Sequence, residues 1–136
     1  MGREYKNLRK SKMNLQNVIL IFVGGGLGSV SRYFTGFYIS KFWQSPFPFG
    51  TFTINVLGCF LIGLIYGFSE KNEWLNSQWR FFLATGFCGG YTTFSTFAFE
   101  NLKLLQNNQV GLFFAYSLLS FVVGLAAVWL GMLLTK

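Results

Sequence analysis

One interrupted apolar segment constrains the fold of this chain more than any other feature. Residues 86–97 read Gly-Phe-Cys-Gly-Gly-Tyr-Thr-Thr-Phe-Ser-Thr-Phe and lie inside an apolar stretch that is long enough to span a membrane. Three glycines and four Ser and Thr residues stand here in place of Leu, Ile and Val. Irregular backbone at membrane depth persists only where protein or a water-filled cavity satisfies its polar groups. The segment therefore predicts a broken membrane helix with an ion or substrate site at the break.

The composition is that of an all-α membrane protein. Of 136 residues, 52% are hydrophobic and 11% are charged, whereas soluble domains carry about 25% charged residues. A membrane helix needs about 20 residues, so four helices fit with short loops. The net charge of +7 lies mainly at the ends and in loops, which is typical of lipid-headgroup anchors and not of a nucleic-acid surface. The absence of histidine and the small number of cysteines and carboxylates argue against a transition-metal centre.

The apolar runs predict four membrane helices. Their expected ranges are 17–40, 50–68, 79–105 and 110–134, with the third broken near Gly89–Thr93. Residues 1–16 form a basic tail, and residues 17–136 form the membrane domain. The sequence Ser-Pro-Phe-Pro at 45–48 predicts a turn between the first two helices, because proline restricts both itself and the residue before it.

An even number of crossings places both termini on the same side of the membrane. Eight Lys and Arg residues flank the helices on that side and two flank them on the other. The positive-inside rule then puts the termini in the cytoplasm. Five of the eight lie in the first 12 residues, and without them the balance is three to two, which hardly fixes an orientation.

Two polar residues inside predicted helices have both structural and functional interpretations. Asn55 either makes a helix–helix hydrogen bond or faces an ion path. Arg32 either extends to the membrane surface or faces protein and water, because an intramembrane arginine is otherwise costly. Glu100 lies three residues before Lys103, so a simple ion pair at a helix end also accounts for it.

The segment after the break has an aromatic face and a hydroxyl face. Phe94 and Phe97 are three residues apart and share one side of a helix, whereas Ser95 and Thr96 point away from it. Phenyl rings have positive edges, so their edges and the hydroxyl donors together suit an anion. The alternatives are ordinary packing for the two rings and back-bonding to helix carbonyls for the hydroxyls.

Together these residues resemble the Fluc/CrcB family of small fluoride channels. The resemblance extends from about residue 18 to the C-terminus. The matching stretches are Gly24–Gly28 with Arg32 and Tyr33, Gly50 and Thr51 with Asn55–Gly58, and residues 86–97 with Glu100, while Tyr116 and Ser120 match more loosely. Two positions depart from some relatives, since Gly124 and Val128 stand where hydroxyls continue a polar track.

The resemblance implies a passive fluoride channel, not an enzyme, in the bacterial inner membrane. It would form an antiparallel, dual-topology homodimer with two pores, and it would confer fluoride resistance by letting fluoride leave the cytoplasm. A central structural Na⁺ would bind the backbone carbonyls of Gly89 and Thr92, and Arg32 would line a vestibule. The pore residues would be Asn55, Phe94, Phe97, Ser95, Thr96, Tyr116 and Ser120.

Two other functions compete with this interpretation. A small proton-coupled drug exporter needs a titratable carboxylate inside a membrane helix, and Glu100 is the only candidate. A non-transporting membrane subunit has no need of a polar break in its third helix. No P-loop pattern indicates a nucleotide-driven pump.

Overall fold

The computed structural model describes residues 14–71 and 77–136, and the regular structure within these ranges is helical. Most of the predicted basic tail lies outside the described residues. The elements are α2 (Leu15–Phe42), α3 (Phe49–Lys71), α4 (Ser77–Arg80), the π-helix η1 (Phe81–Cys88), α5 (Gly89–Tyr91), α6 (Phe94–Gln106) and α7 (Val110–Leu134).

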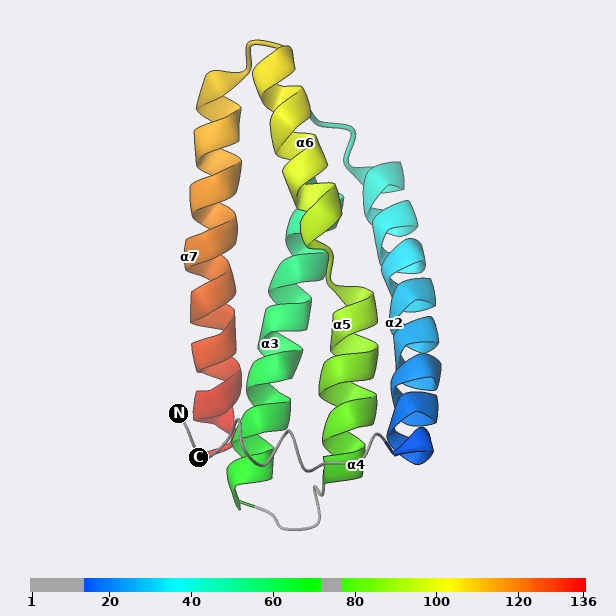
Figure 1. The fold of residues 1–136 in the computed structure, drawn as a ribbon. Helices are drawn as coiled ribbons and strands as arrows, with labels where there is room; N and C mark the ends of the chain where they lie inside the picture. Colours follow the sequence, from blue (N-terminus) through cyan, green and yellow to red (C-terminus); the bar gives the residue numbers. More distant parts are fainter. Residues whose placement is uncertain (1–13, 72–76) are drawn as a thin grey trace, which may run out of the picture.

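The helices run side by side in one bundle. In Figure 1, α2 and α7 lie on the two outer sides, and α3 and the interrupted segment from α4 to α6 lie between them. The main packing partners are α3 with α7, and α2 with η1 and α5. Among the described residues, α2, α3 and α7 are each long and apolar enough to cross a membrane. The chain is therefore a multi-pass membrane protein, and its described part is all-helical.

Local signals set the helix ends. The α2 helix begins at Leu15, two residues earlier than expected, because the Asn14 side chain caps it by accepting the Gln16 N–H at 3.0 Å. The α3 helix continues to Lys71, beyond the expected end at residue 68. The predicted proline turn is present, and the Ser45 hydroxyl accepts the Phe47 N–H at 3.2 Å. The α7 helix has the expected bounds of 110–134.

Small residues allow the helices to approach closely. A Cβ atom added at Gly28 would collide with the carbonyl oxygen of Phe87, and one at Gly24 would collide with that of Phe82. Gly131 of α7 meets the backbone of α3 in the same way, at the Phe60 carbonyl. Packing between membrane helices depends on such contacts, since lipid gives no hydrophobic drive for helices to associate.

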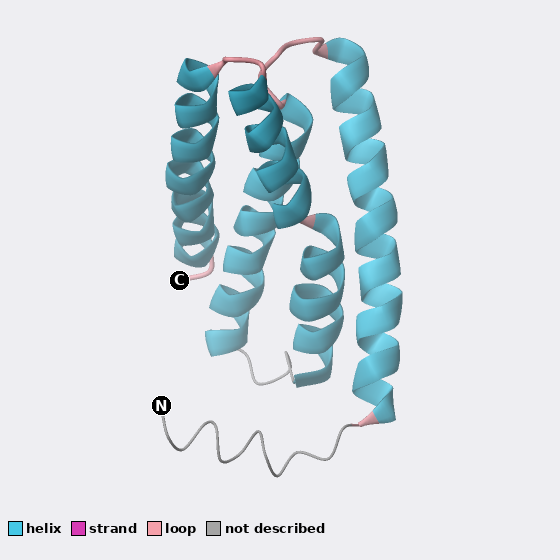
Figure 2. Cartoon of the chain, turned by 45° about the horizontal axis from the view of Figure 1, so that its top comes forward, coloured by secondary structure: helices cyan, strands magenta, loops and turns pink. Residues whose placement is uncertain are grey.

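The third segment is broken later than its glycines suggest. Gly89 and Gly90 are helical, and only Thr92 and Thr93 are extended, with φ/ψ of −80°/159° and −148°/113°. Figure 2 shows the loop that separates α5 from α6 at this point. The glycines serve close packing instead, because a Cβ atom at Gly90 would collide with the carbonyl oxygen of Gly25. The expected break near Gly89–Thr93 is thus confined to its last two residues.

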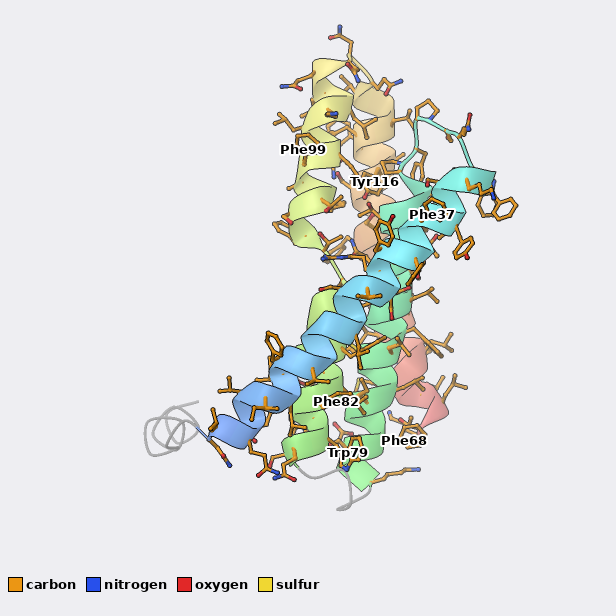
Figure 3. The ribbon with its side chains drawn as sticks, turned by 90° about the vertical axis from the view of Figure 1, so that its right-hand side faces the viewer. Phe37, Phe68, Trp79, Phe82, Phe99 and Tyr116 are labelled. Carbon is orange, nitrogen blue, oxygen red and sulfur yellow. The ribbon has the colours of Figure 1, made fainter. Side chains whose placement is uncertain are left out.

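Aromatic side chains gather toward the ends of the bundle. Figure 3 shows Phe68 and Trp79 at one end and Phe37 and Phe99 toward the other. These four side chains are between 45% and 56% exposed. Exposed aromatic rings at the two ends of a membrane bundle are typical of the lipid headgroup region.

Candidate functional site

The break is held by polar groups from both neighbouring long helices. On the α2 side, Arg32 Nη1 donates to the Thr92 carbonyl at 3.2 Å, and the Ser29 hydroxyl lies 3.5 Å from the Gly90 carbonyl. On the α3 side, the carboxamide of Asn55 makes two hydrogen bonds to the backbone of Thr93. Protein groups therefore satisfy the Thr93 N–H and the carbonyls of Gly90, Thr92 and Thr93, as membrane depth requires.

The threonines of the break have separate local roles. The Thr92 hydroxyl donates to the Cys88 carbonyl at 2.9 Å, which is the back-bonding expected as an alternative. The Thr93 side chain caps α6 by accepting the Thr96 N–H at 3.3 Å. Thr93 also donates to the Thr96 hydroxyl at 2.9 Å. These bonds account for part of the hydroxyl cluster without any ion.

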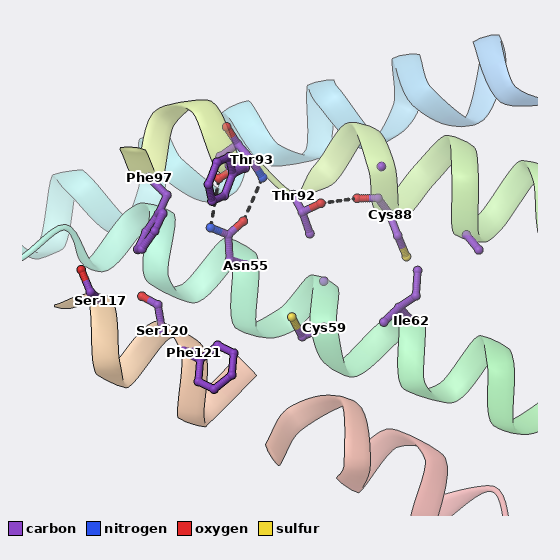
Figure 4. Close-up of a pocket in the computed structure, with 14 residues that line it drawn as sticks. Asn55, Cys59, Ile62, Cys88, Thr92, Thr93, Phe97, Ser117, Ser120 and Phe121 are labelled. Atoms are coloured by element: carbon purple, nitrogen blue, oxygen red, sulfur yellow. Dashed lines mark hydrogen bonds between the residues drawn. The ribbon is translucent and has the colours of Figure 1, made fainter. Parts of the chain in front are cut away.

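A cavity of about 450 Å³ opens beside the break (Figure 4). It brings together six of the predicted site residues, from α3, from α5 and the break, from α6 and from α7. Its predicted members are Asn55, Gly89, Thr92, Phe94, Phe97 and Ser120, and other lining residues include Gly58, Cys59, Ile62, Cys88, Thr93, Ser117 and Phe121.

The two phenylalanines face this cavity as a pair. Their ring centroids are 6.0 Å apart, with an angle of 38° between the ring planes. Phe94 is 79% exposed in the single chain, whereas Phe97 is half-buried. Across the cavity, the hydroxyl of Ser120 is buried and has no hydrogen-bond partner among the described residues. An unpaired hydroxyl beside two phenyl rings is a suitable donor for a small anion.

Tyr116 extends this arrangement to a carboxylate. Its ring is fully buried and lies 5.0 Å from that of Phe97 between centroids. Its hydroxyl donates to Glu100 Oε2 at 2.8 Å, while the Thr51 hydroxyl donates to Oε1 at 2.7 Å. The structure thus pairs Glu100 with two hydroxyls and not with Lys103, whose ammonium lies 4.9 Å from the centroid of the Phe99 ring. Thr51 comes from the start of α3, and its contact with Glu100 was not foreseen from the sequence.

Four predicted site residues do not line this cavity, namely Tyr116, described above, and Ser95, Thr96 and Arg32. Ser95 and Thr96 are exposed and do not line the cavity. Arg32 reaches the break from α2, where its guanidinium bonds a carbonyl. Glu100 lines a second cavity of about 430 Å³ together with Lys103. Residues of the 45–48 turn and of the 107–109 turn also line this cavity.

Comparison with known proteins identifies the family of this chain. Residues 19–132 match the family described as CrcB-like protein, Camphor Resistance (CrcB). A protein of Flavobacterium psychrophilum is 48% identical over 122 residues, which cover 90% of this chain and 98% of that protein. One of Gloeothece citriformis is 46% identical over 119 residues, which cover 88% of this chain and 96% of that one.

A protein of Leptospira interrogans is 40% identical over 121 residues, covering 89% of this chain and 95% of its own length. All three relatives are named fluoride-specific ion channel FluC. These names describe ion channels and no enzyme, in agreement with the expectation from the sequence. The chain therefore belongs to the CrcB family of membrane ion channels.

Proposed function

We propose that this protein is a passive, fluoride-selective channel of the bacterial inner membrane. The observation that carries the proposal is the cavity at the break, where Asn55, Phe94, Phe97 and Ser120 meet. Ring edges and fixed donors can replace the water of a small anion along a narrow path. The names of the relatives specify fluoride as that anion.

Passive permeation is sufficient for export and resistance. Hydrogen fluoride is a weak acid that crosses membranes and dissociates in a near-neutral cytoplasm. The membrane potential, negative inside, then drives the anion outward through an open path. No titratable group needs to change its protonation state during transport. Glu100, the only carboxylate that could support a proton-coupled exporter, is already engaged by two hydroxyl donors.

The working unit is an antiparallel homodimer in which each chain crosses the membrane four times. In this arrangement α4, η1, α5 and α6 together form the third crossing. The open cavity and the 79% exposed ring of Phe94 support a partner at this face. Two equivalent pores, each lined by residues of both chains, follow from the two-fold symmetry of such a pair.

The backbone of the break also suits the Na⁺ ion that the family resemblance implies. In a continuous helix the Thr93 N–H would bond the Gly89 carbonyl, but here it donates to Asn55 at 2.8 Å. The Gly89 carbonyl therefore lacks that partner. The Thr92 carbonyl accepts from Arg32 and keeps a second lone pair. Carbonyl oxygens are ligands that hard cations prefer, so the carbonyls of Gly89 and Thr92 would hold the ion. Its positive charge would offset the carbonyl dipoles that the two chains bring together at a two-fold axis.

The proposal is tested with purified protein in liposomes loaded with fluoride or chloride. Efflux is measured with a fluoride electrode and, in parallel, with a chloride electrode. We expect fast fluoride efflux, with chloride efflux no greater than that of protein-free liposomes. Equal efflux of the two ions would contradict selectivity, and no efflux of either would contradict the channel function itself.

A further inference from the structure

The side chain of Asn55 meets the break at a single residue. Its Oδ1 accepts the Thr93 N–H at 2.8 Å, and its Nδ2 donates to the Thr93 carbonyl at 3.1 Å. Only this orientation of the carboxamide sets a donor against the carbonyl and an acceptor against the N–H. Asn55 therefore acts on the backbone of the third segment from the neighbouring helix α3.

Thr93 has few other ways to satisfy its N–H group. The residue is 7% exposed, and its extended backbone directs the N–H away from the helical partner that Gly89 would supply. A buried N–H without a partner is strongly unfavourable in a membrane. Asn55 provides that partner from a helix 38 residues away in sequence.

The position of Thr93 controls the residues that follow it. Its side chain caps α6 through the Thr96 N–H, so Thr93 fixes where this helix starts. Phe94 is the next residue, and Phe97 lies one turn further along the same face. Any change in the Thr93 backbone therefore changes how both rings enter the cavity.

We propose that Asn55 is a positioning residue, which holds the extended Thr93 unit and thereby aims Phe94 and Phe97 into the pore. One N–H of its Nδ2 holds the Thr93 carbonyl, and the second N–H of the same group stays available to an ion. The consequence for fluoride flux rests on the proposed function, whereas the consequence for the break rests on the hydrogen bonds alone.

The test is amide hydrogen exchange at Thr93, resolved by NMR on the full-length protein in lipid nanodiscs without fluoride. Asn55→Leu removes both hydrogen bonds at similar side-chain size, and exchange at Thr93 should rise by about tenfold or more. Asn55→Asp keeps an acceptor for the N–H, so exchange at Thr93 should stay within about threefold of the parent. Both variants should lose fluoride flux, the second because its negative charge repels the anion.

Asn101→Leu is the matched control. Asn101 is another buried asparagine, but it bonds the Phe97 carbonyl at 3.0 Å and the Ser117 hydroxyl at 2.9 Å. Its replacement should leave exchange at Thr93 unchanged. The Gln109 N–H, which donates to the Leu104 carbonyl at 2.8 Å, is the internal reference for intact folding in every variant.

Unchanged or slower exchange at Thr93 in Asn55→Leu would overturn the proposal, whatever the flux. If that variant does not fold, Asn55→Asp alone tests the proposal. Exchange at Thr93 about tenfold above the parent would then contradict the expectation that the Asp side chain still accepts the Thr93 N–H. Fluoride flux of the parent is measured on the same preparation. Absent flux in the parent would count against the channel function and would leave the exchange comparison valid.

Discussion

At the scale of single residues, the aromatic pair is part of a longer chain of contacts. Phe97 lies beside the buried ring of Tyr116, with centroids 5.0 Å apart, and Tyr116 in turn donates to Glu100. Phe94 has no such support and is 79% exposed at the cavity. The two rings therefore differ in their surroundings, since Phe97 packs against a buried ring and Phe94 is largely exposed.

Replacing either ring by an aliphatic side chain should reduce fluoride flux. Phe94→Ile and Phe97→Ile keep apolar bulk but remove the ring quadrupole, so we expect flux to fall by about tenfold or more. Fluoride efflux from liposomes measures the effect. Phe99→Ile is the control, because Phe99 lies on the same helix α6 and does not line the cavity. Parent-like flux in both single variants would mean that the rings only pack.

At the scale of helices, the close approach of α2 to η1 depends on glycines on one face. Gly24 and Gly28 are buried against backbone carbonyls of η1, whereas a Cβ atom at Gly26 would meet nothing within 4 Å. This difference within one helix separates the effect of packing from the effect of helix propensity. It gives a matched pair of substitutions.

Gly28→Ala should destabilise the protein, while Gly26→Ala should not. The added methyl at position 28 collides with the Phe87 carbonyl and must push the two helices apart, which costs about 1–3 kcal/mol. At position 26 the better helix propensity of alanine should leave stability equal or raise it by up to about 1 kcal/mol. Unfolding in detergent, followed by circular dichroism, gives both free energies of unfolding. Equal effects at the two positions would contradict the close-packing role.

The sequence predicts the helices well where the signal is local. Hydropathy placed α7 at its observed bounds, and the proline turn between α2 and α3 is present. The break is less well predicted, because glycine marks both irregular backbone and close helix contact, and Gly89 and Gly90 serve the second purpose. No local sequence signal predicts the π-helix η1, because its i→i+5 hydrogen bonds form only in a suitable tertiary setting.

The site was predictable to the extent that its residues lie close in sequence. Spacing alone places Phe94 and Phe97 on one helix face, their pore role is what the family resemblance implies, and the cavity contains both. The contact of Glu100 with Thr51 spans 49 residues, so only the packing of α3 against α6 brings the two together. Asn55 had two open interpretations, and the structure supports the helix–helix hydrogen bond without using the second N–H of its amide.

At the scale of the whole molecule, the remaining question is how two chains would pair. The break places an open cavity and the exposed Phe94 in the middle of the third segment. A partner related by a two-fold axis at this level would cover both copies of the cavity at once. An axis in the membrane plane requires chains of opposite orientation. Antiparallel pairing therefore requires that some copies of the chain insert in one orientation and others in the opposite one.

Charge counting provides the strongest argument against dual insertion. Eight Lys and Arg residues lie on the terminal side and two on the other, which under the positive-inside rule favours a single orientation. Five of the eight precede residue 13, and the remaining three against two give almost no bias. Antiparallel pairing thus predicts that the basic tail has a weak influence on insertion. Removing it should then change the orientation mixture only slightly.

We expect both orientations to be present in cell membranes. Gln16→Cys and Gln44→Cys place a thiol near each end of α2 without changing any charge, and both positions are exposed. They are introduced singly, with Cys59→Ser and Cys88→Ser removing the two native thiols. A membrane-impermeant thiol reagent applied to intact cells should label part of each population, and permeabilisation should label the rest. Because opposite ends of one helix lie on opposite sides, a single orientation would give full labelling at one position and none at the other, and that result would exclude the antiparallel dimer.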